Sequence, residues 1–453
     1  MEPTGPALPP TTAAQRNQRL LRLLGANFVS GFAQGITWIA IPWYLVSTRG
    51  ETDGRWLLTS IGAGVTLFTV FWGLYAGTLI DKYNRKYLFL GQNLFGAAVL
   101  MFAALYLRNG WGDEVPVLIL VSATTFGVFT LHYPNLYAFV QELFGPADYP
   151  RVNSGIEIQG QLTNVLGMTT GSVLLAGMEA ETWNLLPFRM QVEAWPLWQI
   201  FALNAITYLI ATVIIRSIAY RPLPDHGKSS QGPVWQRLQT GFRYLKAQPR
   251  LMVFGLVSYM VFFAAMISLQ GIWPIYIREV LHGNGSLLGL AEAFFAAGAL
   301  CAGLLNFWLL RRAGPAVSVR LIGLQLLGTV VLMAALAGFP SVGALLGGSA
   351  LLGLMNTTTR INRLSYLLRQ VPNHLIGRTN SFFQVANGLS RGAYLLLLGI
   401  PFFTGPGNGP NIRWGLLGLS LVLCVSALIL GLWPPQMHNP PKTEARLMHV
   451  NND

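Results

Sequence analysis

Long apolar stretches recur along the whole chain and constrain its fold more than any other feature of the sequence. Each is about 20 to 25 residues long, which at roughly 1.5 Å rise per residue matches the hydrocarbon thickness of a bilayer, about 30 Å. Of the 453 residues, 53% are hydrophobic and only 10% are charged, whereas a soluble protein carries roughly a quarter charged residues. Because lipid offers no partner to an unpaired backbone group, such stretches cross the membrane as helices.

Twelve stretches of this kind predict an all-α polytopic membrane protein with two six-helix halves. Their bounds are 21–47, 56–80, 87–108, 115–139, 153–178 and 198–219, followed by 251–275, 287–310, 320–338, 342–366, 380–403 and 413–433. An even number of spans places both termini on the same side. Positively charged loops stay in the cytoplasm during insertion. With the N-terminus inside, only six basic residues lie at the outer side: Arg49, Arg55, Arg108, Arg189, Arg278 and Arg413. Both termini are therefore predicted to be cytoplasmic.

Composition and motifs exclude several functional classes. The net charge of +13 does not indicate nucleic-acid binding, because the basic residues are scattered over the inner loops rather than gathered on one soluble face. Cys301 and Cys424 both lie inside predicted spans, so we expect no disulfide framework and no metal site. A phosphate-binding loop GxxxxGK[ST] and an HExxH motif are both missing from the sequence. We therefore expect no enzyme, no ATP-driven pump and no cofactor.

An internal repeat supports the division into two halves. Asn135 is followed sixteen residues later by the RVNS segment 151–154, and Asn362 is followed at the same offset by the RTNS segment 378–381. Parallel repeats of six spans are the plan of one large transporter class, with the binding site between the halves. The predicted organisation is a cytoplasmic tail 1–20, a half 21–219, a linker 220–250, a half 251–433 and a cytoplasmic tail 434–453.

The linker contains the segment PVWQRLQTGFRYLK, in which apolar residues recur near helical spacing. This pattern predicts an amphipathic helix lying on the cytoplasmic surface, with basic residues available for lipid phosphates. The alternative is a flexible connection without a helix.

The loop between the second and third spans reads GTLIDKYNRK. Gly77 at the membrane edge would permit close approach of neighbouring helices. Asp81, at the inner end of a helix, needs basic or N–H partners. Lys82, Arg85 and Lys86 supply positive charge for carboxylates or lipid phosphates. The pattern predicts a charged cluster at the inner end of the first half.

This loop resembles the signature loop of the major facilitator superfamily, although Asn84 stands where glycine is common and would have to tolerate a left-handed turn. The resemblance is closest to the macrolide-efflux and enterobactin-exporter-like branch, and it extends to the segments NFVSGFAQGITWIAIPWYL, GFRYLKAQP and PNHLIGRTNS. It implies a bacterial inner-membrane transporter with two pseudo-symmetric halves that works by alternating access. It also implies that the loop braces the cytoplasmic contact between the halves and acts as a conformational gate.

Charged residues inside the spans are candidates for ion coupling or substrate pairing, because a buried charge costs about 2.5 to 3.5 kcal/mol on insertion scales. Glu157 is the first candidate for a proton carrier, and Arg391 is the candidate for pairing with a substrate or a carboxylate. Static ion pairs, or snorkelling of Glu292 to the surface, are the alternatives. The full set is Glu157, Glu292, Arg360, Arg363 and Arg391.

The resemblance also implies a central cavity lined by spans 1, 4, 7 and 10. Aromatic surfaces with a few amides suit a bulky amphipathic solute better than an ion or a sugar. The same residues could instead be packing residues, and His132 a polar residue whose hydrogen bonds are satisfied inside the protein. The candidates are Asn27, Gln34, Trp38, His132, Tyr133, Asn164, Tyr259, Phe263, Gln270 and Asn356.

The sequence thus predicts a secondary active transporter, namely a proton-coupled exporter of bulky amphipathic drug-like or siderophore-like molecules. Its expected partners are a small-molecule substrate, protons and membrane lipids, and we expect a monomer that binds no nucleic acid. Two other functions remain open: a lipid or lysophospholipid flippase, and a gradient-driven importer or facilitator of a small nutrient. A receptor or scaffold without transport is a further alternative.

Overall fold

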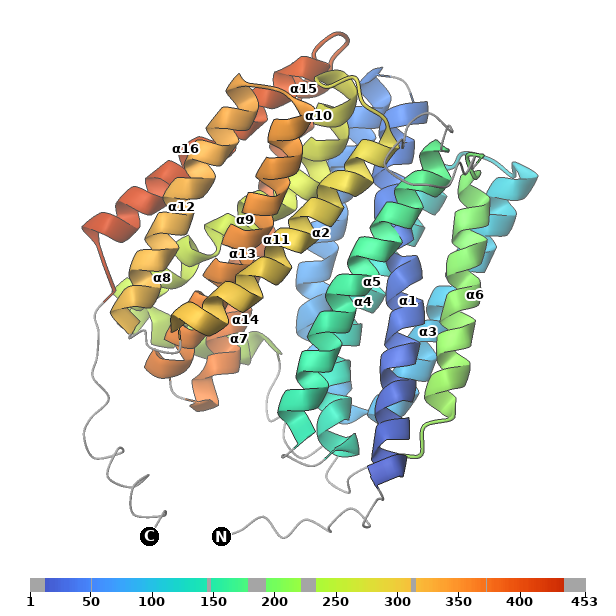
Figure 1. Cartoon of the computed structure of the whole chain (residues 1–453), viewed down its shortest axis with the longest axis horizontal. Helices are drawn as coiled ribbons and strands as arrows, with labels where there is room; N and C mark the ends of the chain where they lie inside the picture. Colours follow the sequence, from blue (N-terminus) through green and yellow to red (C-terminus); the bar gives the residue numbers. More distant parts are fainter. Residues whose placement is uncertain are drawn as a thin grey trace. The chain divides into compact units, whose positions relative to one another are not determined.

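The computed structural model describes residues 13–49, 51–144, 148–177, 193–220, 234–310, 315–371 and 373–435. Every regular element within these ranges is a helix (Figure 1). The chain forms two compact units, the first comprising Met1–Ile41 and Phe71–Gln231, and the second Pro42–Val70 and Gly232–Asp453. Helices α1 (Ala13–Thr48) and α2 (Glu51–Lys82) therefore contribute residues to both units.

The first unit contains four further long helices, and α3 packs along both α4 and α6. Helices α1 and α5 cross closely, because a Cβ atom built on Gly35 would lie only 3.2 Å from the Cα atom of Gly167. Small residues at such crossings allow two backbones to approach. The four helices are α3 (Arg85–Asn109), α4 (Val115–Leu143), α5 (Tyr149–Ala176) and α6 (Leu197–Arg216).

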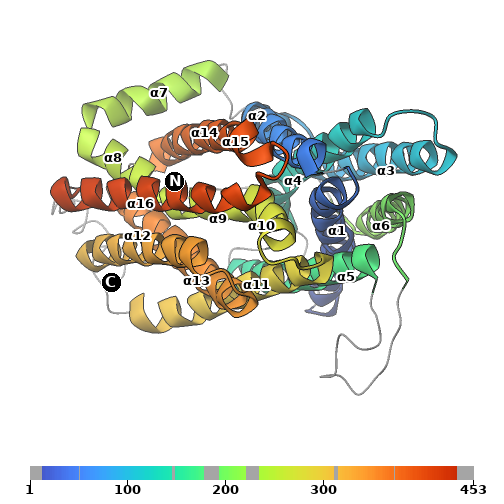
Figure 2. The same ribbon diagram turned by 90° about the horizontal axis from the view of Figure 1, so that it is seen from above.

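Besides Pro42–Val70, the second unit contains the helices from α7 onward, and Figure 2 shows α7 beside α8 and α14. Helix α11 packs along α13, and α12 packs along α13 and α16. Its helices are α7 (Val234–Ala247), α8 (Pro249–Ser258), α9 (Met260–Ile267), η2 (Ser268–Ile272), α10 (Trp273–Glu279), α11 (Gly285–Leu310), α12 (Pro315–Gly338), α13 (Val342–Gln370), α14 (Asn373–Leu398), α15 (Pro401–Thr404), η3 (Gly409–Asn411) and α16 (Ile412–Leu432).

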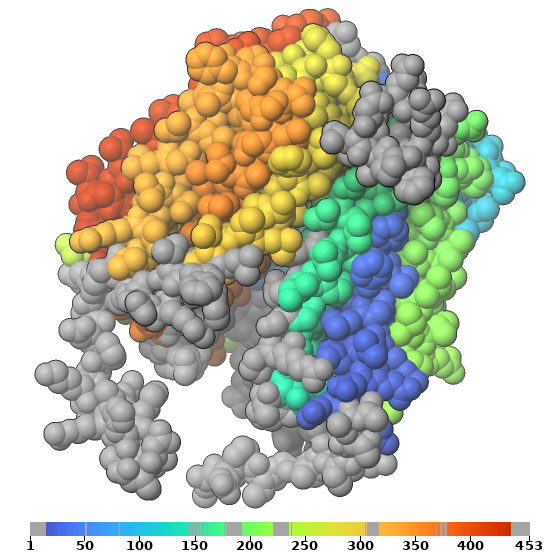
Figure 3. Space-filling model, viewed as in Figure 1, coloured from blue at the N-terminus to red at the C-terminus, as the bar shows by residue number. Residues whose placement is uncertain are grey.

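Nine helical segments in the described residues are long and apolar enough to cross a membrane. The other three long helices, α5, α13 and α14, carry more polar residues, such as the NTTTRINR segment of α13. Together the nine and the three correspond to the twelve predicted spans, so the predicted all-α twelve-helix fold class is confirmed. Their outer sides are apolar: on α12, which lies at the surface in Figure 3, Leu324 and Val331 are 62% and 68% exposed.

The seventh predicted span is not one regular helix. The predicted bounds are 251–275, and the observed segment runs from Pro249 to Glu279. Within it α8 ends at Ser258, and a π-helical turn lies at Ser268–Ile272. At the first break, Arg363 Nη1 donates a hydrogen bond of 3.1 Å to the Ser258 carbonyl. Insertion of a side chain into the backbone ladder is a known cause of such breaks, and π-turns are frequent at functional sites.

Helix α7 lies in the segment where the linker helix was predicted. Leu245 on its inner side is fully buried, whereas Trp235 and Phe242 are 73% and 41% exposed. Gly241 lies against the backbone of Arg378 on α14. Its apolar residues are therefore divided between packing on α14 and an exposed side.

Candidate functional site

The signature loop joins α2 to α3, and its best-defined contact is an ion pair. Arg85 Nη1 lies 2.8 Å from Glu142 Oε1 on α4 and also donates to the Ala138 carbonyl at 2.6 Å. The Glu142 side chain is only 1% exposed. Tyr220, which follows α6, donates its hydroxyl hydrogen to Glu142 Oε2. Burial and this hydrogen bond raise the pKa of Tyr220, so it stays protonated as the donor.

Backbone acceptors hold the rest of the loop. Lys86 Nζ donates to the carbonyls of Arg216 and Ile218 at 2.9 and 2.7 Å, which ties the start of α3 to the end of α6. The left-handed turn expected at Asn84 is not formed, because its φ is −58°. Asn84 instead caps α3, and its Oδ1 accepts from the backbone N–H groups of Lys86 and Tyr87.

The other loop residues make fewer contacts. Lys82 is exposed, with its Nζ 5.3 Å from the centroid of the Tyr83 ring. Gly77 is exposed, and a Cβ atom built there would meet no described atom within 4 Å, so the close helix approach expected there is not present in this part of the structure. The side chain of Asp81 lies outside the described residues. Sequence reasoning did not identify Glu142 as a site residue. The one available signal was its position near the end of an apolar span.

A buried chain of polar side chains crosses the first unit. Gln92 Nε2 lies 3.0 Å from His132 Nδ1, and His132 Nε2 lies 2.6 Å from Asn27 Oδ1. Asn27 Nδ2 donates to Gln159 Oε1, and Gln159 Nε2 donates to Thr163 Oγ1 at 3.0 Å. Because Asn27 uses its N–H₂ group for Gln159, its oxygen accepts from His132 Nε2–H. Both imidazole nitrogens of a neutral His132 are thus satisfied, which favours the packing interpretation.

The other predicted cavity residues of the first unit form an aromatic cluster with polar edges. The Trp38 ring stacks on Phe126 at 5.4 Å and meets Phe129 edge-on at 4.8 Å. Tyr133 meets Phe129 edge-on at 5.0 Å. Gln34 Nε2 donates to the Thr125 carbonyl at 3.2 Å. Asn164 is half-buried on α5.

In the second unit two of the predicted residues, Tyr259 and Arg363, meet at the break between α8 and α9. Arg363, which is 7% exposed, places its Cζ atom 3.5 Å from the centroid of the Tyr259 ring. Tyr259 donates its hydroxyl hydrogen to Asn380 Oδ1 at 2.9 Å. Asn387 Nδ2 donates to the Tyr259 carbonyl at 3.4 Å. Three helices, α13, α14 and the α8–α9 segment, are therefore joined at one buried point.

Arg391 lies on α14, with its Cζ atom 5.4 Å from the centroid of the Phe262 ring. Arg360 is exposed on α13. The remaining predicted cavity residues are dispersed: Phe263 meets Tyr394 edge-on at 5.6 Å, Gln270 lies in the π-helical turn, and Asn356 is half-buried.

The two predicted carboxylates differ in what the structure shows. Glu292 on α11 is 8% exposed and makes no ion pair or hydrogen bond to any residue that the structure describes. The side chain of Glu157 lies outside the described residues. A third carboxylate was missed from the sequence: Glu279, at the end of α10, pairs with Arg55, which is only 1% exposed.

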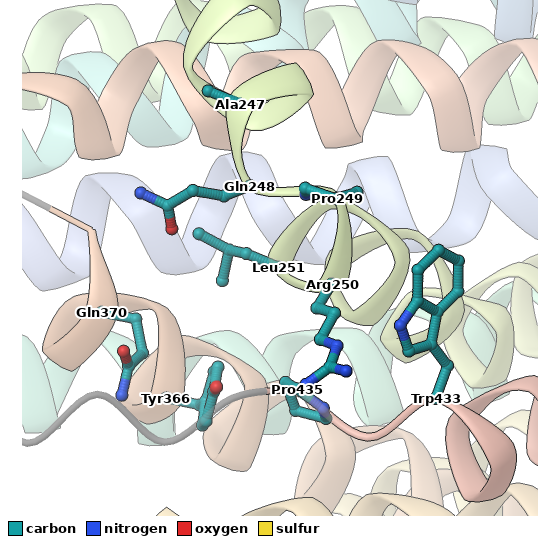
Figure 4. Close-up of a pocket in the computed structure, with 9 residues that line it drawn as sticks. All are labelled: Ala247, Gln248, Pro249, Arg250, Leu251, Tyr366, Gln370, Trp433 and Pro435. Atoms are coloured by element: carbon teal, nitrogen blue, oxygen red, sulfur yellow. The ribbon is translucent and has the colours of Figure 1, made fainter.

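A cavity of about 470 Å³ lies at the junction of α7 and α8 (Figure 4). Arg250 extends into it toward Pro435, and Tyr366 and Trp433 line its sides. None of the charged residues predicted for coupling lines this cavity.

A chain built from membrane-length helices, with ion pairs and unpaired charges among them, is a multi-pass membrane protein. Residues 23–395 match the Major Facilitator Superfamily. The chain therefore belongs to this family and is a membrane transporter, not an enzyme.

Solved structures of transporters share the fold. A bacterial homologue of the human lysosomal transporter Spinster, inward-facing and unoccupied, is 13% identical and superposes with a TM-score of 0.69 over 95% of this chain and 100% of that chain. The nucleoside transporter NupG is 15% identical, with a TM-score of 0.64 over 91% and 98%. A D-xylose-proton symporter is 12% identical, with a TM-score of 0.63 over 92% and 98%. Among curated proteins none matches the chain.

Proposed function

We propose that this transporter is a proton-coupled exporter of bulky amphipathic organic molecules in the bacterial inner membrane. In this proposal both termini are cytoplasmic, and the halves 21–219 and 251–433 alternate the access of a central site. The observation that carries the coupling part is the environment of Glu292.

Glu292 is a buried carboxylate without a described partner. An unpaired ionised carboxylate inside a membrane has a high free-energy cost. Binding a proton removes this cost, so proton binding and release at Glu292 would favour different conformations of the transporter. Between Asp225 and Glu444 the sequence contains only two acidic residues, Glu279 and Glu292. Glu279 is held by Arg55 at 3.1 Å. Glu292 is therefore the acidic side chain of this stretch that is available to exchange a proton.

The proposed substrate class follows from the aromatic residues. Trp38, Phe129 and Tyr133 are half-buried and form one aromatic surface in the first unit. In the second unit the half-buried Tyr394 meets Phe263, which is only 3% exposed. Large aromatic surfaces with a few amide groups suit organic molecules that have both apolar and polar parts.

The test is transport by purified protein in proteoliposomes, with and without a pH gradient, using macrolides, cationic dyes and catecholate siderophores. Gradient-driven movement that Glu292→Gln abolishes, and that the exposed-residue control Glu193→Gln retains, would support the proposal. Glu157→Gln tests the second carboxylate in the same assay. Transport by Glu292→Gln with unchanged pH dependence would contradict the role of Glu292.

A lipid or lysophospholipid flippase is the second candidate, and the two arginines of α13 favour it. Arg363 is buried and Arg360 is exposed, so a phosphate could move between an interfacial and a buried guanidinium. Redistribution of labelled lysophospholipid between leaflets, without export of the organic solutes, would favour this function. The same vesicles also report the direction in which the solute moves. Accumulation in the direction opposite to export would indicate an importer.

A further inference from the structure

The second unit carries buried positive charge that its own acidic residues do not balance. From Ala293 to Pro435 the sequence contains no aspartate or glutamate. Arg363 is 7% exposed, and Arg391 Nε is buried without a hydrogen-bond partner. Neither guanidinium forms an ion pair with a carboxylate in the described part of the chain.

Each of these two cations lies against an aromatic ring, and the two rings contact each other. The centroid of the Tyr259 ring lies 3.5 Å from Arg363 Cζ, and the centroid of the Phe262 ring lies 5.4 Å from Arg391 Cζ. The two ring centroids are 6.4 Å apart. We call these four residues the arginine–aromatic cluster.

The contacts within the cluster do not neutralise it. A cation–π contact stabilises a guanidinium by less than the free energy that is lost when the group leaves water. An opposite charge is needed to offset this desolvation cost. The partners that Arg363 does have are neutral: the Tyr259 ring and the Ser258 carbonyl at 3.1 Å. Guanidinium groups offer only donors, arranged to bind carboxylate or phosphate oxygens.

We propose that the arginine–aromatic cluster binds the anionic group of an amphipathic organic anion, a carboxylate or a phosphate, and that Tyr259 and Phe262 contact its apolar part. The proposal of an anion-binding site is supported by the contacts within the second unit alone. The statement that the bound anion is the transported substrate rests on the proposed function.

The break in the helix strengthens this assignment. Because α8 ends at Ser258 and α9 begins at Met260, Tyr259 lies at the junction. Asn380 and Asn387 hold its hydroxyl group and its carbonyl from α14, at 2.9 and 3.4 Å. An anion bound here would contact elements from three helices at a point where the backbone is already interrupted. Its binding would therefore bias how these helices pack.

Arg391 offers the cleaner test, because the structure gives it no hydrogen bond whose loss would disturb the fold, whereas Arg363 also supports the Ser258 carbonyl. Equilibrium binding to the purified full-length protein is measured with three probes of matched aryl-alkyl chain: a carboxylate, its uncharged methyl ester and a quaternary ammonium. We expect the carboxylate to bind at least 10-fold more tightly than the ester. Arg391→Gln should remove this difference, Arg391→Lys should retain part of it, and Arg369→Gln, an exposed residue on α13, should retain all of it.

Two further arms separate the sources of the anion. A lysophosphatidate that binds better than the carboxylate identifies a lipid phosphate, and inorganic phosphate that competes identifies the free anion. Tighter binding of the ester or the ammonium, or an unchanged carboxylate affinity in both Arg391→Gln and Arg363→Lys, would overturn the inference. Failure of the proposed function looks different: anion binding that depends on Arg391 persists, but no solute moves with the pH gradient.

Discussion

Arg55 Nη1 lies 3.1 Å from Glu279 Oε1, which joins the beginning of α2 to the end of α10 within the second unit. Arg55 is only 1% exposed, and its Nη2 also donates to the Gly405 carbonyl at 2.8 Å. Helix α2 precedes α10 by some two hundred residues in the sequence. The Arg55 guanidinium is nevertheless buried where these two helices meet. Removal of the carboxylate would leave a buried cation with carbonyl partners alone.

We predict that Glu279→Gln destabilises the protein by about 3 kcal/mol, because breaking a buried ion pair strands the remaining charge. Thermal unfolding in detergent measures the change. Arg278→Gln is the matched control, since Arg278 Nε lies 3.9 Å from Glu279 Oε1 and its side chain is 39% exposed. Equal stability of the two variants would show that the Arg55 pair contributes little.

A second prediction concerns Glu142, which accepts from both Arg85 and Tyr220. Tyr220→Phe removes one hydrogen bond to a charged group and should cost roughly 1.5 to 3 kcal/mol. Glu142→Gln should cost more, because it also leaves Arg85 without its carboxylate. The order of the two melting temperatures checks this, and a Tyr220→Phe protein less stable than Glu142→Gln would contradict it.

Asp81→Asn should preserve expression and folding but slow transport, because the resemblance assigns this residue to the inner conformational gate. Turnover in proteoliposomes and the yield of folded protein are compared in parallel. Lys82→Gln, at the exposed neighbouring position, tests whether any charge change in the loop has the same effect. Normal turnover by Asp81→Asn would remove the role assigned to the loop.

His132 is predicted to act in packing and not in proton coupling. Its two nitrogens are already bonded to Gln92 and Asn27, so His132→Gln should retain the pH dependence of transport while lowering stability by about 1 to 3 kcal/mol. The profile is measured beside that of Glu292→Gln, which we expect to lose its pH dependence. A flattened profile in His132→Gln would move the coupling site into the first unit.

The agreement between predicted spans and observed helices has a simple cause. The thickness of the bilayer and the need to satisfy backbone groups fix the length of an apolar stretch without reference to the rest of the fold. The span predicted at 342–366 is thus observed as α13, Val342–Gln370. The break at Ser258 was not predictable in this way, because it depends on Arg363, about a hundred residues further along the chain.

The sequence alone determined the helical class, the positions of the spans, the family loop and the short set of intramembrane charges, because each is a local or compositional property. Only the tertiary structure decided which charges are paired. It assigns Arg55 to Glu279 and Arg85 to Glu142, and it leaves Glu292 and Arg391 without an opposite charge among the described residues. Pairing requires two side chains within about 4 Å, and helices distant in the sequence reach that separation only when they pack.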